Sequence, residues 1–528
     1  SQSDIQTKIV PALLTALKTQ TNNDIITGCL MSLAKIGNLN EESDFGEVIV
    51  PFLADRNQEI SETAALALGI LGSEEHIELL NSLITHGSYG LEAVGRTNEV
   101  PFRTRSFAVY ALGLIANKSH DVEVISSIAY NLRETLATDQ SSYKDVKIAA
   151  VVSMSLLRLD EDTQKEQVEF LLEYFRNENN DHLVRAHIPE ALSHTLIGAK
   201  NENYLAYKEI LSNEFIGRLT SSSKEKREVQ QSCVLGLGLL GDADESDLDK
   251  KIRKALYDIP MNVSDQQTRA FALISLASIG STEGDSLFAV QEVQSYLTNQ
   301  VTRGKNFVKP WASVSLGIMA NNLNEAAVPV PSTINTVLRK SIKEERSPSR
   351  LGAVSIAAGL AGHVEMGELL QEKLAKVNDA ETQGYLCVSL GLLNHRAAIE
   401  QIKEIVVKAK YRPALLQQAA IGIGLMGDHS LVPALVEMLR ESKSSASQAS
   451  IVTALAFIGD SRSVDPLVAL LNDENYTERA RGFAAAALGM VADRLLLPWN
   501  SDLSCDLNYR ASTPTLNDLE GTGILNIL

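Results

Sequence analysis

Apolar residues recur along almost the whole chain with the spacing of an α-helix. In a typical segment Ala272, Leu276 and Ile279 stand three or four positions apart, which places their side chains on one face of a helix. Such segments end in one recurring phrase: Leu, then Gly or Ala, two apolar or variable residues, a small residue, and finally Asp, Ser, Asn or His. The small residue lets the chain leave the helix tightly, and the polar residue can cap the next helix. The pattern predicts a helical chain with essentially no sheet.

The phrase repeats at regular intervals, which indicates a repeat architecture. Its Gly or Ala markers lie about 40 residues apart in the middle of the chain, as at 277 and 317, and 32 or 33 apart near its end. With three weaker copies we count about thirteen repeats. The clear copies are ALGILGS at 67–73, ALGLIAN at 111–117, LGLLGD at 237–242, LASIGS at 276–281, LGIMAN at 316–321, AGLAGH at 358–363, LGLLNH at 390–395, IGLMGD at 423–428, LAFIGD at 455–460 and LGMVAD at 488–493, and the weaker ones are LAKIGN at 33–38, SLLRLD at 155–160 and HTLIGA at 194–199.

A second helix belongs to each repeat. Segments such as VPALVEML at 432–439 and VDPLVALL at 464–471 follow the phrase, and VPALLTAL at 10–17 fits the same frame. A Pro in the first helical turn is tolerated because its missing N–H has no partner within the helix. We therefore predict an all-α superhelix of about thirteen helical hairpins, a HEAT- or armadillo-like solenoid, over residues 1–493.

These phrases resemble HEAT repeats, in particular the short bacterial subtype first associated with phycobilisome lyases. The resemblance covers the chain from about residue 5 to 493. It implies a fold that hosts scaffolds, adaptors, a few lyases and occasional hydroxylases. The run GLGLLG at 236–241 also resembles the repeats of the large ring-shaped subunits of the proteasome base. The sequence leaves an open superhelix and a closed ring as alternatives.

Residues 85–102 interrupt the repeat pattern with a Gly-rich insertion. In repeat proteins such insertions map to loops on one face, often the binding face. We expect a loop here, either a plain long connection or a partner-binding segment. The candidate binding residues are Tyr89, Leu91, Arg96 and Phe102.

Residues 494–528 form a second segment without the repeat pattern. The run LLLPW at 495–499 is predicted to cover the apolar side of the last repeat, because the end of a repeat stack has to be capped. The remainder is predicted to run as turns and extended chain. Its last apolar residues are predicted to dock on a hydrophobic groove, either of this molecule or of a partner; they are Ile524, Leu525, Ile527 and Leu528.

A polar or basic residue stands eight positions before several of the markers. By the resemblance to HEAT proteins, it precedes the helix that lines the concave face. We expect these residues to bond within the repeat stack as a structural ladder, and an anion-binding stripe is the alternative. The basic members are Arg105, Arg269, Lys309 and Arg481, and Gln383 and Gln448 occupy the same position in two other repeats.

The chemistry-bearing residues do not form a recognisable catalytic or metal motif. His187, Glu190 and His194 have a spacing that one helix face could use for a metal, but Pro189 indicates a helix start that leaves His187 outside it. HEAT-type deoxyhypusine hydroxylases hold iron on His-Glu dipeptides, and none of the nine histidines is followed by Glu. The four cysteines lie far apart and show neither disulfide nor metal spacing. We predict no metal and no cofactor.

The charge balance narrows the class of partner. The chain has 66 acidic and 48 basic residues and a net charge of -18, so its average field repels nucleic acid and anionic membrane surfaces. No apolar run approaches the roughly 18 residues of a membrane span, so we predict no membrane insertion. The compartment, cytoplasmic or exported, and the oligomeric state stay open.

These observations favour a non-catalytic scaffold or adaptor that binds a polypeptide along its curved surface. The alternative is a HEAT-type lyase or another enzyme component with its site in the concave groove. The identity of the partner is not encoded in any recognisable motif.

Overall fold

The computed structural model describes residues 2–39, 44–141, 143–197, 203–220, 223–282, 287–442 and 444–493. Within these ranges the regular structure is entirely helical, which confirms the predicted all-α fold. The predicted tail and its four apolar residues Ile524, Leu525, Ile527 and Leu528 lie outside the described residues. The chain divides into two compact units, one made of residues 1–195 and 432–528 and the other of residues 196–431.

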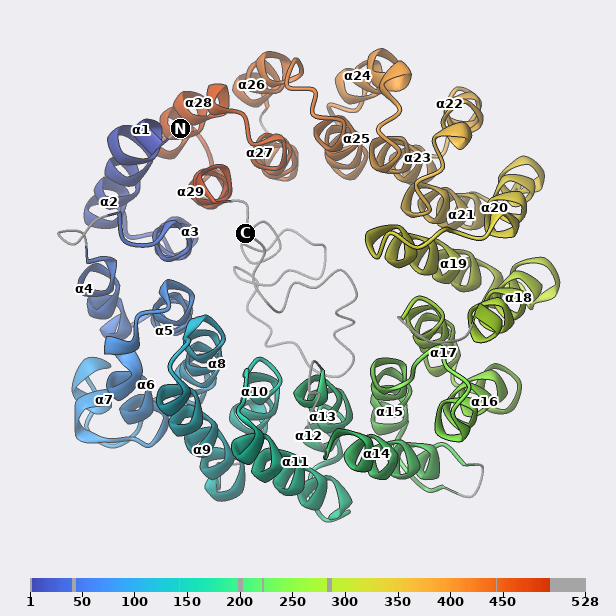
Figure 1. The fold of residues 1–528 in the computed structure, drawn as a ribbon. Coiled ribbons are helices and arrows are strands. Elements are labelled where there is room, and N and C mark those ends of the chain that lie inside the picture. Colours follow the sequence, from blue (N-terminus) through green and yellow to red (C-terminus); the bar gives the residue numbers. More distant parts are fainter. Residues whose placement is uncertain are drawn as a thin grey trace. The chain divides into compact units, whose positions relative to one another are not determined.

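The first unit contains both ends of the helical chain (Figure 1). Its helices and helical turns are α1 (Gln2–Asp4), η1 (Ile5–Ile9), α2 (Val10–Thr19), α3 (Asn23–Ile36), α4 (Phe45–Ile49), η2 (Val50–Ala54), α5 (Gln58–Leu71), η3 (Glu74–His76), α6 (Ile77–Ile84), α7 (Ser88–Ala93), α8 (Phe102–Lys118), α9 (Val122–Thr138), α10 (Asp145–Met154), α11 (Glu161–Arg176), α12 (His182–Arg185), α13 (Ile188–Leu196), α26 (Val432–Glu441), α27 (Ser445–Ile458), η6 (Ser461–Ser463), α28 (Val464–Asn472) and α29 (Glu478–Ala492).

The second unit continues the same alternation of helices. Its elements are α14 (Tyr204–Arg218), α15 (Arg227–Leu240), α16 (Asp247–Asn262), α17 (Gln266–Ile279), α18 (Leu287–Arg303), α19 (Val308–Glu325), α20 (Ser332–Glu344), α21 (Pro348–Leu360), η4 (Val364–Met366), α22 (Gly367–Leu374), α23 (Ala380–Leu392), η5 (Arg396–Ala398), α24 (Ile399–Lys408) and α25 (Pro413–Leu425).

The recurring phrase ends one helix and starts the next. Gly459 follows α27 with a φ of 65°, in the left-handed region that glycine adopts without strain. The side chain of the next residue, Asp460, accepts a hydrogen bond from the backbone N–H of Arg462 and caps η6. We call a helix that ends in the phrase a marker helix.

Marker glycines allow neighbouring marker helices to approach closely. A Cβ at Gly113 of α8 would lie 2.7 Å from the Cβ of Ser153 of α10. The Ser153 hydroxyl donates to the carbonyl oxygen of Val109, four residues before the glycine, at 3.0 Å. The contact recurs between α15 and α17, where Ser275 donates to the carbonyl of Val234, four residues before the marker glycine, at 2.9 Å.

The first and last marker helices, α3 and α29, pack against each other in the same way (Figure 1). The Ser32 hydroxyl of α3 donates to the carbonyl of Ala485, four residues before Gly489 of α29, at 2.8 Å. A Cβ at Gly489 would lie 2.4 Å from the Ser32 hydroxyl oxygen. We call the contact of η1, α2 and α3 with α28 and α29 the terminal junction. Within the first unit, α3 thus follows α29 as the next marker helix would.

The insertion at 85–102 contains a short helix, where the sequence suggested a loop. α7 packs against α6, and a Cβ at Gly90 would lie 2.5 Å from the backbone of Ser82 and Leu83, so glycine permits this approach. Phe102 is the first residue of α8, and the insertion therefore ends directly on a marker helix.

Candidate functional site

A cleft of about 1000 Å³ lies beside the insertion in the first unit. Its lining comes from the start of α5, the end of α6 with residues 85–86, residues 96–102, the first turns of α8, α9 and the segment that follows α9. Of the predicted binding residues, Arg96 and Phe102 line the cleft, whereas Tyr89 and Leu91 are not part of its lining. Tyr89 is 49% exposed on α7, and Leu91 is half-buried.

A buried ion pair lies on one side of the cleft. Arg105 Nη2 donates to Asp139 Oδ1 at 2.7 Å, and only 8% and 4% of the two side chains are exposed. Arg105 Nε also donates to the carbonyl of Ile84 at 2.8 Å, at the end of α6. Asp139 Oδ2 accepts from the Ser141 hydroxyl. Arg105 and Asp139 therefore neutralise each other and tie three segments of the wall together.

An aromatic pair forms another part of the wall. The rings of Phe102 and Tyr143 are stacked, with centroids 3.7 Å apart and planes 5° from parallel. Phe102 begins α8, and Tyr143 comes from the connection between α9 and α10. Tyr143 is 50% exposed, so the pair offers an aromatic surface to a bound molecule.

Three charged side chains of the cleft stay uncompensated. Glu99, Glu134 and Arg96 line it and are exposed. In the part of the chain that the structure describes, none of the three forms an ion pair or hydrogen bond through its charged group. The free carboxylates therefore outnumber the free guanidinium.

His86 fixes the backbone at the entry to the insertion. Its Nδ1 accepts a hydrogen bond from the backbone N–H of Val100 at 2.9 Å, across the insertion. Burial lowers the pKa of His86, and the positive charge of Arg105 lowers it further. Both effects favour the neutral ring, which is the form that can accept this bond.

The other ladder residues differ in their contacts. Arg481 Nε donates to the carbonyl of Leu471 at 2.9 Å, at the end of α28, and Arg269 Nε donates to the carbonyl of Val263 after α16. Gln383 and Gln448 make the equivalent bonds to Val377 and Ser442. Lys309 is half-buried and makes no such side-chain bond with the described residues.

The sequence did not reveal Arg185 as a ladder residue, although its side chain also bonds to a carbonyl near the end of the preceding long helix. Arg185 Nε donates to the carbonyl of Phe175, the penultimate residue of α11, at 2.8 Å, and 3% of the residue is exposed. It was missed because the phrase between the markers at 113 and 238 is weak, so no marker fixed the position eight residues ahead.

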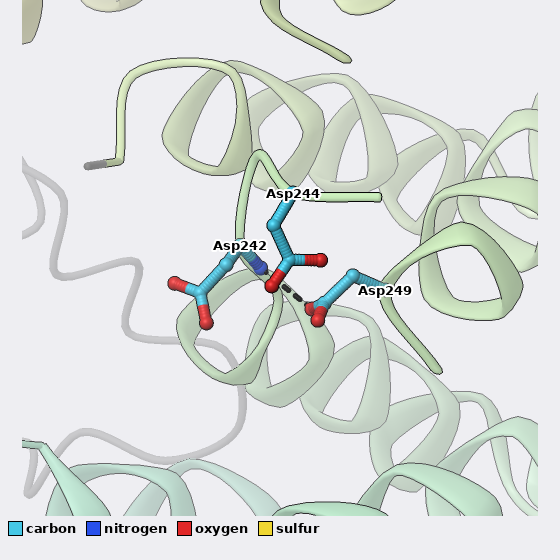
Figure 2. A group of neighbouring side chains, drawn as sticks. All are labelled: Asp242, Asp244 and Asp249. Carbon is cyan, nitrogen blue, oxygen red and sulfur yellow. Dashed lines mark hydrogen bonds between the residues drawn. The ribbon is translucent and has the colours of Figure 1, made fainter. Parts of the chain in front are cut away.

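Three aspartates in the second unit come close enough to suggest a cation site: Asp242, Asp244 and Asp249 (Figure 2). Lys208 Nζ lies 2.5 Å from Asp242 Oδ2 and 2.9 Å from Asp249 Oδ1. The Lys208 ammonium therefore supplies the positive charge that a bound metal ion would otherwise provide. Asp249 also accepts from the backbone N–H of Asp242, the bond drawn in Figure 2. The cluster thus fixes the turn between α15 and α16.

The histidine spacing noted in the sequence does not produce a comparable group. α13 begins at Ile188, one residue after His187. Among the described residues, His187, Glu190 and His194 do not converge as potential ligands of one ion. No described helix is long and apolar enough to cross a bilayer.

The fold and the cleft define a class: an all-α protein of stacked helical hairpins with a polar cleft beside an insertion. Residues 432–498 match the family model for HEAT repeats. This match includes the phrases LAFIGD and LGMVAD, and it does not resolve the bacterial subtype. A comparison with curated proteins finds no match.

Several solved structures are similar in outline. Yeast importin-beta is 13% identical with a TM-score of 0.43, and the alignment covers 93% of this chain and 70% of that one. An engineered protein is 18% identical with a TM-score of 0.30, covering 85% of this chain and 99% of that one. A complex of Kap95 with Nup1 is 11% identical with a TM-score of 0.39, covering 90% and 68%. At these scores the similarities carry no argument about function.

Proposed function

We propose that this protein is a non-catalytic scaffold that binds a polypeptide partner, and that the cleft beside the insertion is a docking site. The observation that carries the proposal is the cleft itself: about 1000 Å³, lined by the stacked Phe102 and half-exposed Tyr143 and by charged groups without partners. A stack of helical hairpins offers long surfaces of this kind to other polypeptides. Aromatic residues and Arg are also the side chains most often enriched where proteins bind one another.

The three titratable groups Arg105, Asp139 and His86 support a structural role at the side of the cleft. Arg105 and Asp139 are engaged with each other, and His86 Nδ1 is engaged with the backbone of Val100. A general base or nucleophile has to reach the substrate with a free group. These three residues instead hold the walls of the cleft in place.

A site-specific cross-link tests the proposal. A photoreactive amino acid at Asn131, which lines the cleft on α9, should trap a partner in cells of the source organism. The same probe at Glu78, exposed on α6 and outside the cleft lining, is the matched control. The variant Tyr143→Ala should then reduce trapping at position 131. The proposal is wrong if the trapped proteins are the same at both positions, or if Tyr143→Ala leaves trapping at 131 unchanged.

A further inference from the structure

We infer that the segment docked in this cleft is basic, with a Lys or Arg side chain lying against the Phe102–Tyr143 pair between Glu99 and Glu134. The inference rests on the proposed function and adds the chemistry of the partner. It follows from the balance of free charges, from the exposed aromatic surface and from the charge of the whole chain.

The charges of the cleft favour a cation. The buried Arg105–Asp139 pair contributes no net charge, which leaves the carboxylates of Glu99 and Glu134 against the guanidinium of Arg96. The net charge of -18 adds a long-range attraction for basic segments. An acidic segment would meet two unpaired carboxylates and the repulsion of the whole chain, and like charges placed together oppose binding.

The aromatic pair suits the same side chain. A cation is attracted to the face of an aromatic ring, and the aliphatic part of Lys or Arg packs on the same face. Tyr143 is half-exposed while its other side is stacked on Phe102. A purely apolar segment would leave the charged groups of the cleft without partners, at a cost that a basic segment avoids.

Selection from random octapeptides displayed on phage tests the inference with the full chain as bait. The wild-type protein should select peptides enriched in Lys and Arg. The double variant Glu99→Gln with Glu134→Gln should lose that enrichment. The control variant Glu47→Gln with Glu78→Gln removes the same charge from exposed positions of α4 and α6 that do not line the cleft, and it should select the wild-type pool.

One selected peptide, labelled and titrated by fluorescence anisotropy, gives the size of the effect. We expect the cleft double variant to bind it about three- to tenfold more weakly, as the loss of two partly exposed ion pairs predicts. Tyr143→Leu should weaken binding further while unfolding at the wild-type temperature. Affinity should fall with rising salt for the wild type and less for the double variant.

The inference is overturned if the wild type selects acidic or apolar peptides or none, or if the double variant and its control behave alike. These outcomes are separable from a failure of the docking site. If a partner still cross-links at Asn131 and loses the cross-link in Tyr143→Ala, while the carboxylate variant has no effect, the cleft binds a polypeptide of a different charge.

Discussion

The interface between α8 and α10 and the terminal junction between α29 and α3 use the same contacts. They differ in the length of chain that connects the two helices. In each, a marker glycine faces a serine whose hydroxyl donates to the carbonyl four residues before the glycine. The two bonded residues lie 44 positions apart in the first interface and 453 in the second. The contacts are therefore alike, but only α8 and α10 are also joined by a short stretch of chain.

This difference bears on how the molecule opens. α8 and α10 are held by α9, which links them directly and packs against both. Among the described helices, none connects α29 to α3 in this way, so we expect the two sides of the junction to separate more readily than α8 and α10. Cys29 reports on such separation. It lies fully buried on α3, burial raises the pKa of its thiol, and Arg481 of α29 lies near enough to lower that pKa in part.

The largest expected effect comes from placing a side chain on the two marker glycines. Gly489→Val puts its Cβ on Ser32 across the junction, and Gly113→Val puts it on Ser153. Overpacking of this kind costs about 1–3 kcal/mol, which corresponds to an increase of about 5- to 150-fold in junction opening for Gly489→Val. We expect faster alkylation of Cys29 by iodoacetamide in that variant and a lower unfolding temperature in both.

Peptide mass spectrometry in a Cys505→Ser background measures the alkylation. Cys233 and Cys387 are equally buried on α15 and α23 and serve as internal controls. Protection of Cys29 in Gly489→Val, together with a loss of thermal stability like that of Gly113→Val, would show that the junction opens only when the whole unit unfolds.

A smaller effect is expected from removing the two hydroxyls. Ser32→Ala and Ser153→Ala each remove one buried hydrogen bond, which lowers the free energy of unfolding by about 1 kcal/mol. Urea denaturation should give similar losses for the two variants. Only Ser32→Ala should speed the alkylation of Cys29, by about fivefold. Equal alkylation of Cys29 in the two variants would argue against a separately opening junction.

The smallest effect is expected at the exposed rim of the junction. Lys8 on η1 lies 2.8 Å from Asp465 on α28, and the hydrogen bond to Asp465 raises the pKa of Lys8. Both side chains are largely in contact with water, so salt should screen the pair. Raising sodium chloride to about 1 M should speed Cys29 alkylation by less than about twofold, and Lys8→Met should abolish that dependence. If salt speeds Cys29 alkylation in Lys8→Met as much as in the wild type, charges other than the Lys8–Asp465 pair cause the salt dependence.

Much of the fold could be predicted because its signals are local. The phrase predicted helix ends such as that of α27, where Gly459 takes a left-handed φ and Asp460 caps the next turn. The slot eight residues before the marker picked out Arg105, Arg269 and Arg481, whose bonds run to the preceding helix or the turn after it. Lys309 occupies the same position but makes no such bond with the described residues. The spacing from the marker therefore does not guarantee that a carbonyl acceptor lies within reach.

The candidate site was only half predictable. Arg96 and Phe102 stood out because they interrupt the repeat. Glu134, Asp139 and Tyr143 lie in or just after an ordinary repeat helix, and nothing in their spacing distinguishes them. They join the cleft because α9 packs beside α8, and the direction of a side chain across two packed helices depends on tertiary geometry.

The sequence by itself determined the helical class, the repeat and the ends of the helices that carry a clear phrase, because helical periodicity, caps and glycine exits act within a few residues. Only the tertiary structure decided that Gly489 meets Ser32 and that Tyr143 stacks on Phe102. In the first case, Ser32 and its hydrogen-bond acceptor Ala485 lie 453 positions apart, and no local pattern in the sequence specifies which distant helix will pack against an exposed helix face. In the second, the contact depends on how one hairpin sits on the next, which is set by the packing of whole helices.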